Sequence, residues 1–474
     1  MNEFKGKRVA ILGLARQGTA LARYLARAGA DVVVSDILPA EKLSRALAEL
    51  KDLTIEYALG GHPESLLEGA DLLCLSGGVP TGLPIVRAAR QRGIPLSNEA
   101  QIFLKNCAAP VIGITGSAGK TTTTALVGRM LQEGGVGSKV WVGGNIGNPL
   151  IGDLDRIAAQ DWIVMELSSY QLEITWTSPD IAAVLNITPD HLDRHETMAV
   201  YSEAKAHILD FQQSEDMAVL GLDDPGSSIL KGRARGRLAW FSVERTVEQG
   251  ALLRGEHLMI RFDGREREVG GVSEIALRGR HNLLNVLAAC AIAGSAAVEP
   301  EAMRRGITGF AGVAHRLEFV REVNGARWYD DSIATSPERA CAAIQSFQEP
   351  LVLLAGGRDK NLPWSKFGEL ARKRVRHLVL FGEARELIAS AVGAWGAGGA
   401  ERGAAGAAPG EAARQGGALQ SVSLASNLAE AVEQAAGLAR PGDVVLLSPG
   451  GTSFDEFIDF AERGDRFKEF VNAL

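Results

Sequence analysis

One stretch of the sequence, VIGITGSAGKTTTT, has the residue types and the order of a phosphate-binding loop. An apolar run leads into a turn that contains Gly116 and Gly119, and Lys120 and Thr121 follow at once. Glycines let backbone N–H groups point into such a turn, a lysine can reach the outer phosphates, and a threonine hydroxyl can bind Mg²⁺. The usual pattern has its first glycine where this chain has Ile114. We interpret the stretch as a nucleotide site, and the alternative is a glycine-rich turn without a ligand.

Further polar residues follow two other apolar runs. Glu166 ends the run WIVME, and the segment NITPDHLDRH contains His191 and His195. In a parallel sheet the carboxyl ends of the strands share one edge, where such groups could bind a metal ion or substrate. The alternatives are a solvated glutamate at a strand end and structural histidines. Lys205 lies in a predicted helix, and composition alone indicates a solvated surface lysine there.

A second glycine-rich turn, GLARQG, lies near the start of the chain and runs from Gly13 to Gly18. Asp36 ends the next predicted strand, near the spacing at which an acidic residue meets a ribose hydroxyl. Ala15 replaces the middle glycine of the dinucleotide fingerprint, and the turn LSGGVP, with Gly77, could offer further N–H groups to a phosphate. We interpret this unit as a site for a nucleotide diphosphate other than NAD. The alternatives are a turn without a ligand and an NAD-dependent oxidoreductase.

Alternating apolar runs and helical patterns must position these residues. The predicted strands are Lys7–Leu12, Asp31–Ser35, Trp162–Glu166, Ile181–Leu185, Leu351–Leu354, His377–Phe381 and Asp443–Leu447. We therefore predict an α/β protein with a Rossmann-like domain at 1–107, a P-loop ATPase-like parallel sheet at 108–313 and a second Rossmann-like domain at 314–474. The stretch 391–420 is rich in alanine and glycine, and it is predicted to be a flexible insertion because it has few large apolar side chains.

The composition bounds the class of protein. With 46% hydrophobic and 23% charged residues the chain is typical of a globular protein, and a formal net charge of −7 gives no general affinity for nucleic acid. The four cysteines are far apart, which disfavours a disulfide framework. No apolar run approaches the roughly 20 residues that span a bilayer, and no signal-peptide pattern is present. We expect a cytoplasmic protein that binds neither nucleic acid nor membrane.

Seven segments together resemble the Mur ligases, and they occur in that family's order over nearly the whole chain. They are GITGSAGKTT, GGNIG, ELSSYQLE, NITPDHLDRH, YSEAKAHI, GRHNLLNVLAA and HRLE. The ELSSYQLE stretch and the C-terminal LLSPGGTSFDEFIDFAERGDRF are similar to the glutamate-adding branch. The resemblance implies an enzyme of peptidoglycan precursor synthesis that works as a monomer. ATP would phosphorylate the L-alanine carboxylate of UDP-N-acetylmuramoyl-L-alanine, and the amine of D-glutamate would displace phosphate from that acyl phosphate.

The resemblance also implies roles for individual residues. The implied catalytic residues are Lys120, Glu166, His191, Lys205 and Arg316. The implied ATP contacts are Gly116, Ser117, Gly119, Lys120, Thr121, Thr122, Asn282, Asn285, Arg316 and Asp331. The implied contacts with the UDP-linked substrate are Gly13, Leu14, Ala15, Arg16, Asp36, Gly77, Asn145, Ser168 and His191. The implied glutamate contacts are Thr335, Lys360, Ser453, Phe454 and Phe460. Two Mg²⁺ ions are implied, with the ligands Thr121, Glu166, His191 and a carbamylated Lys205.

Two positions depart from the family pattern. Ala118 stands where an asparagine is usual, so one amide contact of the loop is lost. Ile333 replaces a lysine, so a cation near the amino-acid pocket is missing. We predict D-glutamate as the amino acid added, and L-glutamate is the alternative within the same chemistry. The alternatives from other classes are the oxidoreductase and a nucleotide-binding regulator without catalytic activity.

Overall fold

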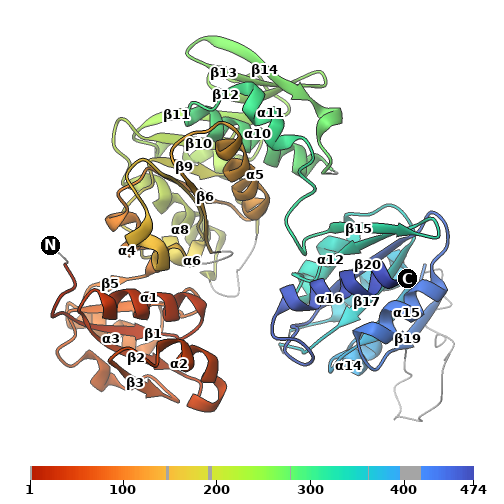
Figure 1. The fold of residues 1–474 in the computed structure, drawn as a ribbon, viewed down its shortest axis with the longest axis horizontal. Helices are drawn as coiled ribbons and strands as arrows, with labels where there is room; N and C mark the ends of the chain where they lie inside the picture. Colours follow the sequence, from red (N-terminus) through yellow and green to blue (C-terminus); the bar gives the residue numbers. More distant parts are fainter. Residues whose placement is uncertain (1–2, 146–148, 190–194, 278, 361, 395–417) are drawn as a thin grey trace. The chain divides into compact units, whose positions relative to one another are not determined.

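The computed structural model describes residues 3–145, 149–189, 195–277, 279–360, 362–394 and 418–474. The chain divides into two compact units, at 1–310 and 311–474 (Figure 1). The first unit contains two sheets and the second unit contains one, with helices packed on all three. The prediction of an α/β fold is therefore confirmed.

The first sheet is parallel and has the strand order β3-β2-β1-β4-β5. Its strands are β1 (Arg8–Leu12), β2 (Asp31–Asp36), β3 (Ile55–Leu59), β4 (Leu72–Leu75) and β5 (Leu96–Ser97). Its helices are α1 (Arg16–Arg27), α2 (Ser44–Leu50), α3 (Pro84–Gln91) and α4 (Glu99–Asn106). The strand order reverses between β1 and β4, and ligands of open α/β sheets bind outside the carboxyl ends of the strands at such a point. The turns with Gly13 and Gly77 follow these two strands.

The central sheet has the strand order β14-β13-β12-β11-β10-β9-β6-β8-β7. Its strands are β6 (Val111–Thr115), β7 (Val140–Gly144), β8 (Trp162–Glu166), β9 (Ile181–Val184), β10 (Met217–Gly221), β11 (Arg237–Ser242), β12 (Gly250–Arg254), β13 (His257–Phe262) and β14 (Arg265–Gly271). β6 is flanked by β9 and β8, so the predicted phosphate loop starts from the interior of the sheet. Each pair from β7 to β12 is parallel.

The prediction of a wholly parallel central sheet needs one correction, because β13 and β14 pair antiparallel. Only two residues join each pair of strands from β12 to β14, which is too short for the crossover that parallel strands require. In the second turn Asp263 and Gly264 both have positive φ, at 50° and 72°. That conformation suits a two-residue hairpin, and the Asp-Gly pair in the sequence is its signal.

Helices and short 3-10 turns connect the central strands. The helices are α5 (Lys120–Glu133), α6 (Ser169–Leu172), α8 (Met198–Asp210), α9 (Pro225–Ser228), α10 (Arg280–Ser295) and α11 (Pro300–Ile307). The 3-10 helices of the first unit are η1 (Ala40–Lys42), η2 (Glu64–Leu67), η3 (Leu150–Arg156), η4 (Ile229–Gly232) and η5 (Val272–Glu274). α5 packs against α10 and α11, whereas α8 packs against α6. The start of α10 is thereby held near the start of α5.

The second unit has a six-stranded sheet of order β15-β16-β20-β17-β18-β19. Its strands are β15 (Glu318–Val323), β16 (Ala326–Asp330), β17 (Leu351–Gly356), β18 (Val375–Phe381), β19 (Ser421–Leu424) and β20 (Val444–Gly450). Its helices are α12 (Pro337–Gln345), α13 (Ser365–Arg374), α14 (Arg385–Ala391), α15 (Leu428–Leu438) and α16 (Phe460–Ala473). One apolar cluster joins the sheet to α12, α13 and α14, and another joins it to α15 and α16. β15 is antiparallel to β16 across an Asn324-Gly325 turn, and the other pairs are parallel.

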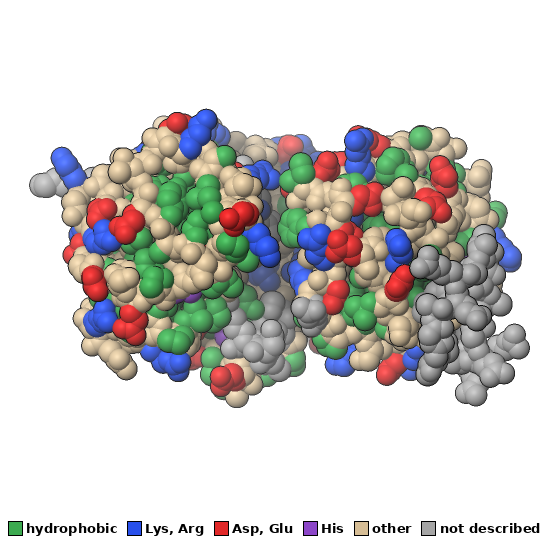
Figure 2. Space-filling view, turned by 90° about the horizontal axis from the view of Figure 1, so that it is seen from below, with side chains coloured by type: hydrophobic (Ala, Val, Ile, Leu, Met, Phe, Trp, Pro, Cys, Tyr) green, Lys and Arg blue, Asp and Glu red, His purple; other side chains and the backbone are tan. Residues whose placement is uncertain are grey.

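Each predicted strand coincides with a strand of the structure to within two or three residues at either end. The predicted insertion at 391–420 lies largely outside the described residues. No helix in the described part of the chain is long and apolar enough to cross a bilayer. On the face of each unit that Figure 2 shows, acidic and basic side chains are interspersed with apolar ones.

Candidate active site

The loop between β6 and α5 is folded around the amine of Lys120. Lys120 Nζ donates to the carbonyls of Gly116, at 2.8 Å, and Ser117, at 3.2 Å. Gly119 is the N-cap of α5 with φ +84°, and a Cβ there would lie 2.1 Å from Asn285 Oδ1, so this position requires glycine. Ile114 is fully buried within β6. The usual first glycine is absent because this position still belongs to the strand, and the turn begins only at Gly116.

Residues that the sequence interpretation did not single out hold this loop in place. The Asn186 side chain accepts from Ala118 N at 2.9 Å and donates to Ala118 O at 3.1 Å. Ser117 Oγ lies 3.0 Å from the hydroxyl of Tyr201 and donates to Thr188 O at 2.9 Å. Asn186 follows β9, the strand beside β6. Its side-chain amide therefore reaches the loop from a neighbouring strand. Asn186 is the first residue of the segment NITPDHLDRH, in which the sequence pointed to the two histidines rather than to the asparagine.

Glu166 is held between two polar side chains at the carboxyl edge of the central sheet. Thr121 Oγ1 donates to Glu166 Oε2 at 2.9 Å, and Asn145 Nδ2 donates to Glu166 Oε1 at 3.1 Å. The Glu166 residue is only 2% exposed. The three side chains come from the start of α5, the end of β8 and the end of β7, which share this edge because the strands are parallel neighbours. Glu166 and Thr121 form an oxygen-rich pair of the kind that Mg²⁺ prefers.

Lys205 is buried, so the interpretation as a solvated surface lysine is wrong. Its side chain is 1% exposed, on α8. Nζ donates to Gly116 O at 3.0 Å and to Thr115 Oγ1 at 3.5 Å, and it lies 4.7 Å from the ring centroid of Tyr201. The amine therefore lies against the predicted phosphate loop. Helical periodicity could not reveal this, because α8 is apolar over much of its surface and has little amphipathic contrast.

Two asparagines at the start of α10 belong to the same region. Asn285 Nδ2 donates to Asn282 Oδ1 at 3.1 Å, and Asn285 lies against Gly119. Thr122 is buried one residue beyond Thr121 in α5. His191 lies outside the described residues, and Ser168 caps α6 by accepting from Gln171 N at 3.3 Å.

The turn after β1 is held by Asp36. Asp36 Oδ2 accepts from Leu14 N at 2.7 Å and Oδ1 accepts from Leu38 N at 2.9 Å. Gly13 has φ +91°, and a Cβ at Gly18 would lie 1.9 Å from the carbonyl oxygen of Gly13, so the turn packs directly on the helix backbone. Ala15 is the N-cap of α1 and offers no side-chain cap, which leaves the first N–H groups of α1 for another acceptor.

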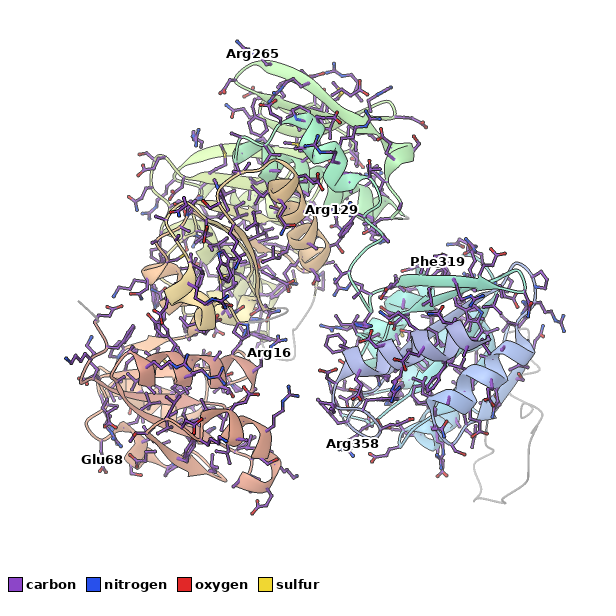
Figure 3. All side chains as sticks on the ribbon, viewed as in Figure 1. Arg16, Glu68, Arg129, Arg265, Phe319 and Arg358 are labelled. Atoms are coloured by element: carbon purple, nitrogen blue, oxygen red, sulfur yellow. The ribbon has the colours of Figure 1, made fainter. Side chains whose placement is uncertain are left out.

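Arg16 connects the first sheet to the central sheet. Its Nη2 donates to the backbone carbonyl of Asn145 at 3.1 Å, and Figure 3 labels it on α1. The turn after β4 is tied to the same helix, because Gly77 N donates to Gln17 Oε1 at 3.1 Å. Predicted substrate contacts from both sheets are therefore joined through Arg16 and Asn145. Gln17 lies within the GLARQG turn, and only this contact gives it a role there.

In the second unit the predicted glutamate contacts lie at one edge of the sheet. Thr335, Lys360 and Ser453 follow β16, β17 and β20, which are adjacent parallel strands. Lys360 Nζ donates to Thr335 Oγ1 at 3.4 Å. Phe454 is 61% exposed, whereas Phe460 begins α16 and its ring contacts that of His315. The edge carries one amine, of Lys360, and two hydroxyl groups, of Thr335 and Ser453.

The predicted ATP contacts of the second unit lie beside this edge. Asp331 is buried after β16, and its carboxylate accepts from Ser448 Oγ at 2.9 Å and from Leu317 N at 3.2 Å. Burial raises the pKa of Asp331 to about 7, against hydrogen bonding from Ser448 and the positive charge of Arg316, which lower it. Arg316 is half-buried next to His315, whose Nδ1 lies 2.8 Å from Asp330 Oδ2.

Arg463 is a further residue of this edge that sequence reasoning missed. It is fully buried on α16, and it donates to Ser332 Oγ and Ser332 O at 2.9 Å and to Gly451 O at 3.2 Å. Burial lowers the pKa of Arg463 to about 10, although the charges of Asp455, Asp330 and Glu456 raise it. The guanidinium group thus joins the loops after β16 and β20. A lone arginine in a helix offers no sequence signal for this position.

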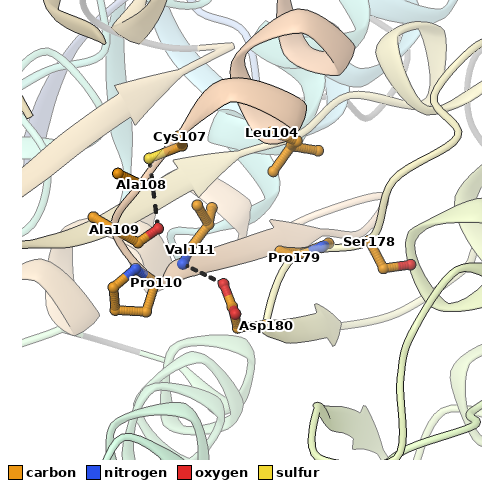
Figure 4. A pocket seen from close by; sticks show the side chains of 9 residues that line it. All are labelled: Leu104, Cys107, Ala108, Ala109, Pro110, Val111, Ser178, Pro179 and Asp180. Atoms are coloured by element: carbon orange, nitrogen blue, oxygen red, sulfur yellow. Dashed lines mark hydrogen bonds between the residues drawn. The ribbon is translucent and has the colours of Figure 1, made fainter. Parts of the chain in front are cut away.

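A pocket of about 340 Å³ lies away from these residues (Figure 4). It lies where α4 ends and β6 begins. Its lining residues are Leu104, Cys107, Ala108, Ala109, Pro110, Val111, Ser178, Pro179 and Asp180. Asp180 accepts from Val111 N at 2.7 Å. The pocket is at the amino end of β6, opposite the phosphate loop, and none of the candidate site residues lines it.

Comparisons with known proteins cover the same three regions. The family model for the N-terminal domain, described as Mur ligase MurD-like, matches residues 7–98. The Mur ligase middle domain matches 114–293, and the Mur ligase glutamate ligase domain matches 315–451. A UDP-N-acetylmuramoylalanine--D-glutamate ligase of Acetivibrio thermocellus is 39% identical over 100% of this chain and 99% of its own. A ligase of the same name from Symbiobacterium thermophilum is 41% identical over 99% of this chain and 98% of its own.

Solved structures share the fold at lower sequence identity. The UDP-N-acetylmuramate-alanine ligase MurC of Thermotoga maritima has a TM-score of 0.56 at 19% identity, over 98% of this chain and 99% of its own. MurF of Acinetobacter baumannii has a TM-score of 0.56 at 17% identity, over 98% of this chain and 92% of its own. With full-length relatives near 40% identity, the predicted family is confirmed and the oxidoreductase alternative is not. The chain therefore belongs to the Mur ligase family of ATP-dependent, amide-forming ligases.

Proposed function

We propose that the chain adds D-glutamate to UDP-N-acetylmuramoyl-L-alanine, with conversion of ATP to ADP and phosphate, in peptidoglycan synthesis. The observation that carries this proposal is the connection from Lys120 and Thr121 through Glu166 to Asn145 and Arg16. It brings a phosphate loop into contact with groups of the first domain, where the sequence predicts the UDP-linked substrate. The relatives at 39% and 41% identity are named for this activity.

The proposed reaction has two steps. A carboxylate oxygen of the L-alanine residue attacks the γ-phosphorus of ATP, and ADP leaves. The amine of glutamate then attacks the carbonyl carbon of the acyl phosphate, the C–N bond forms, and inorganic phosphate leaves with the electrons of the C–O bond while the amine loses a proton. A carboxylate needs this activation because its own oxygen is a poor leaving group.

The residues of the first unit have distinct tasks in the first step. Lys120 neutralises charge on the outer phosphates, and the N–H groups at the start of α5 point toward the same oxygens. Asn145 positions the substrate carboxylate while it also holds Glu166. Arg16 and the turn of Gly13 bind the UDP-linked part of the substrate, together with Gly77. Asn282 and Asn285 bind the adenine side of ATP, and Arg316 and Asp331 are proposed as further ATP contacts.

The oxygen donors around Thr121 and Glu166 fit Mg²⁺, because both side chains are buried and both offer oxygen atoms to a hard cation. A bound Mg²⁺ would offset the charge of the phosphoryl group during transfer. Lys205 is proposed as a further ligand in carbamylated form, since its amine is buried beside Gly116 and a carbamate would replace its positive charge with a negative one. His191 is proposed as a ligand on the resemblance alone. The proposed enzyme acts as a monomer in the cytoplasm.

An assay of phosphate release tests the proposed function. Purified protein with ATP, Mg²⁺ and UDP-N-acetylmuramoyl-L-alanine should release phosphate in proportion to added D-glutamate, and the product should contain one more glutamate by mass. L-glutamate in a parallel reaction tests the alternative amino acid. Phosphate release that is independent of both enantiomers, or no release at all, would contradict the proposed ligase.

A further inference from the structure

The glutamate edge of the second unit holds a cation that no role above uses. Arg339 lies in the first turn of α12 and is exposed. Its Nη1 donates to the carbonyl of Ile333 at 3.4 Å, which is a long hydrogen bond. Thr335, the hydroxyl partner of Lys360, is two residues further along the same turn. Arg339 and Lys360 therefore approach one short turn from two different elements.

The turn that receives both cations is well defined. Ala334 N donates to Asp331 O and Thr335 N donates to Ile333 O, each at 2.9 Å. Gly450 N, at the end of β20, donates to Ala334 O at 2.8 Å and fixes the turn to the sheet. The backbone of this turn, including the Ile333 carbonyl, is thus positioned by backbone contacts rather than by the cations.

Arg339 and Lys360 differ from Arg463, whose positive charge is offset by Asp455, Asp330 and Glu456. Within the described part of the chain, no carboxylate forms an ion pair with Arg339 or with Lys360. Burial, and then the charges of Arg339 and Arg463, lower the pKa of Lys360. Arg463 cannot meet a ligand directly, because it is fully buried and its N–H groups are donated to Ser332 and Gly451. Arg339 is exposed, and most of its N–H groups remain available.

A dicarboxylic amino acid brings two negative charges to this edge, and Lys360 can pair with only one of them. A guanidinium group offers a planar fork of donors that matches a carboxylate in two parallel hydrogen bonds. Resting on the proposed function, we propose that Arg339 is the second cation of the amino-acid pocket and binds one carboxylate of the incoming glutamate. Arg339 would thus supply a positive charge from α12 beside Ile333, whose own side chain is uncharged.

Three substitutions separate the charge of Arg339 from its hydrogen bond to Ile333. Arg339→Ala removes both, Arg339→Gln keeps a donor for the carbonyl but has no charge, and Arg339→Lys keeps the charge but has no fork. We expect the KM for D-glutamate to rise about ten- to a hundredfold in Arg339→Ala and Arg339→Gln, and less in Arg339→Lys. The KM values for ATP and for the UDP-linked substrate should change less than about twofold.

The matched control is Arg440→Ala, which removes an exposed arginine before β20, at the opposite edge of the same sheet. It should leave every KM unchanged. D-glutamine, which lacks the side-chain carboxylate, shows which carboxylate Arg339 binds. If Arg339 binds the side-chain carboxylate, the preference for D-glutamate over D-glutamine should be lost in Arg339→Ala. If Arg339 binds the α-carboxylate, the KM values for both amino acids should rise together in Arg339→Ala.

A wild-type KM for D-glutamate in Arg339→Gln, or in folded Arg339→Ala, would overturn the proposal. Thermal unfolding of each variant distinguishes a loss of the pocket from a loss of the fold. Failure of the wild-type protein to release glutamate-dependent phosphate would instead contradict the proposed function, so the two failures are distinguishable.

Discussion

Thr121 Oγ1 and Glu166 Oε2 are 2.9 Å apart, although 45 residues separate them in the chain. The contact joins the first turn of α5 to the last residue of β8. It exists because β6 and β8 are parallel neighbours, so the loop after one strand faces the end of the other. The hydroxyl and carboxylate oxygens are thereby placed at the mouth of the phosphate loop.

Glu166→Gln should abolish most of the activity without unfolding the protein. The amide has nearly the volume of the carboxylate and can still accept from Thr121, but it lacks the charge that a metal ion requires. We expect turnover to fall at least about a hundredfold and the Mg²⁺ dependence of nucleotide binding to weaken. Phosphate release and calorimetric titration with nucleotide, with and without Mg²⁺, measure these effects. Glu215→Gln, on an exposed loop, is the control, and equal activity in both variants would remove Glu166 from the mechanism.

Gly119→Ala should impair nucleotide binding far more than a comparable change elsewhere. Both Gly119 and Gly135 have positive φ, at +84° and +60°, so alanine costs about 1–2 kcal/mol of conformational strain at either. Only at Gly119 would the new Cβ meet another atom, Asn285 Oδ1, whereas nothing lies within 4 Å of a Cβ at Gly135. ATP affinity should therefore fall in Gly119→Ala and stay normal in Gly135→Ala. Similar ATP affinities of the two variants would show that contact with Asn285 does not shape the loop.

Lys205 should carry a carbamate in the active protein. The step is addition of the neutral amine to carbon dioxide with loss of one proton, which leaves one negative charge on the side chain. Isotope-labelled bicarbonate should give a carbamate signal in the NMR spectrum of the wild-type protein, and Lys205→Arg should lose both the signal and the activity. Lys139→Arg, at an exposed lysine, should keep both. A labelled signal that persists in Lys205→Arg would assign the carbamate to another residue.

Glu99 should make the protein less stable as the pH rises. Burial raises the pKa of Glu99 to about 7, above the ordinary value of 4.5, although Gln171 donates to it at 3.4 Å. Between pH 4.5 and 7 the folded state keeps a proton that the unfolded state releases, so stability falls through this range, by up to about 3 kcal/mol. Glu99→Gln should flatten this dependence.

Urea unfolding at pH 5 and pH 8 measures the effect on the wild type and on Glu99→Gln. The variant should gain stability relative to the wild type on going from pH 5 to pH 8. Glu56→Gln, at an exposed glutamate on β3, is the control and should not show this gain. A parallel pH dependence of the wild type and Glu99→Gln would show that Glu99 is ionised in the folded protein.

Much of the fold could be predicted, because buried strands of a parallel sheet are continuous apolar runs that need no partner to be recognised. The strands at Trp162–Glu166 and Ile181–Val184 follow this rule. The hairpins β12–β13–β14 and β15–β16 were missed, since their strands are half-exposed and carry charged residues such as Arg265 and Glu322. The pairs Asp263-Gly264 and Asn324-Gly325 are typical of hairpin turns. They identify a hairpin only when the flanking segments are known to pair as strands, and the sequence does not show that pairing.

The sequence by itself determined the family and the positions of the buried strands along the chain, and it predicted the phosphate loop, because each depends on residues that are close together in the chain. Only the tertiary structure decided that the buried amine of Lys205 lies against that loop. It also decided that Asn186 contacts Ala118 in the loop and that Asn145 contacts Glu166. The approach of Arg339 and Lys360 to one turn is likewise a tertiary feature. These relationships join side chains from different strands and helices. They depend on strand order and on the packing of helices against the sheets, which local residue patterns do not contain.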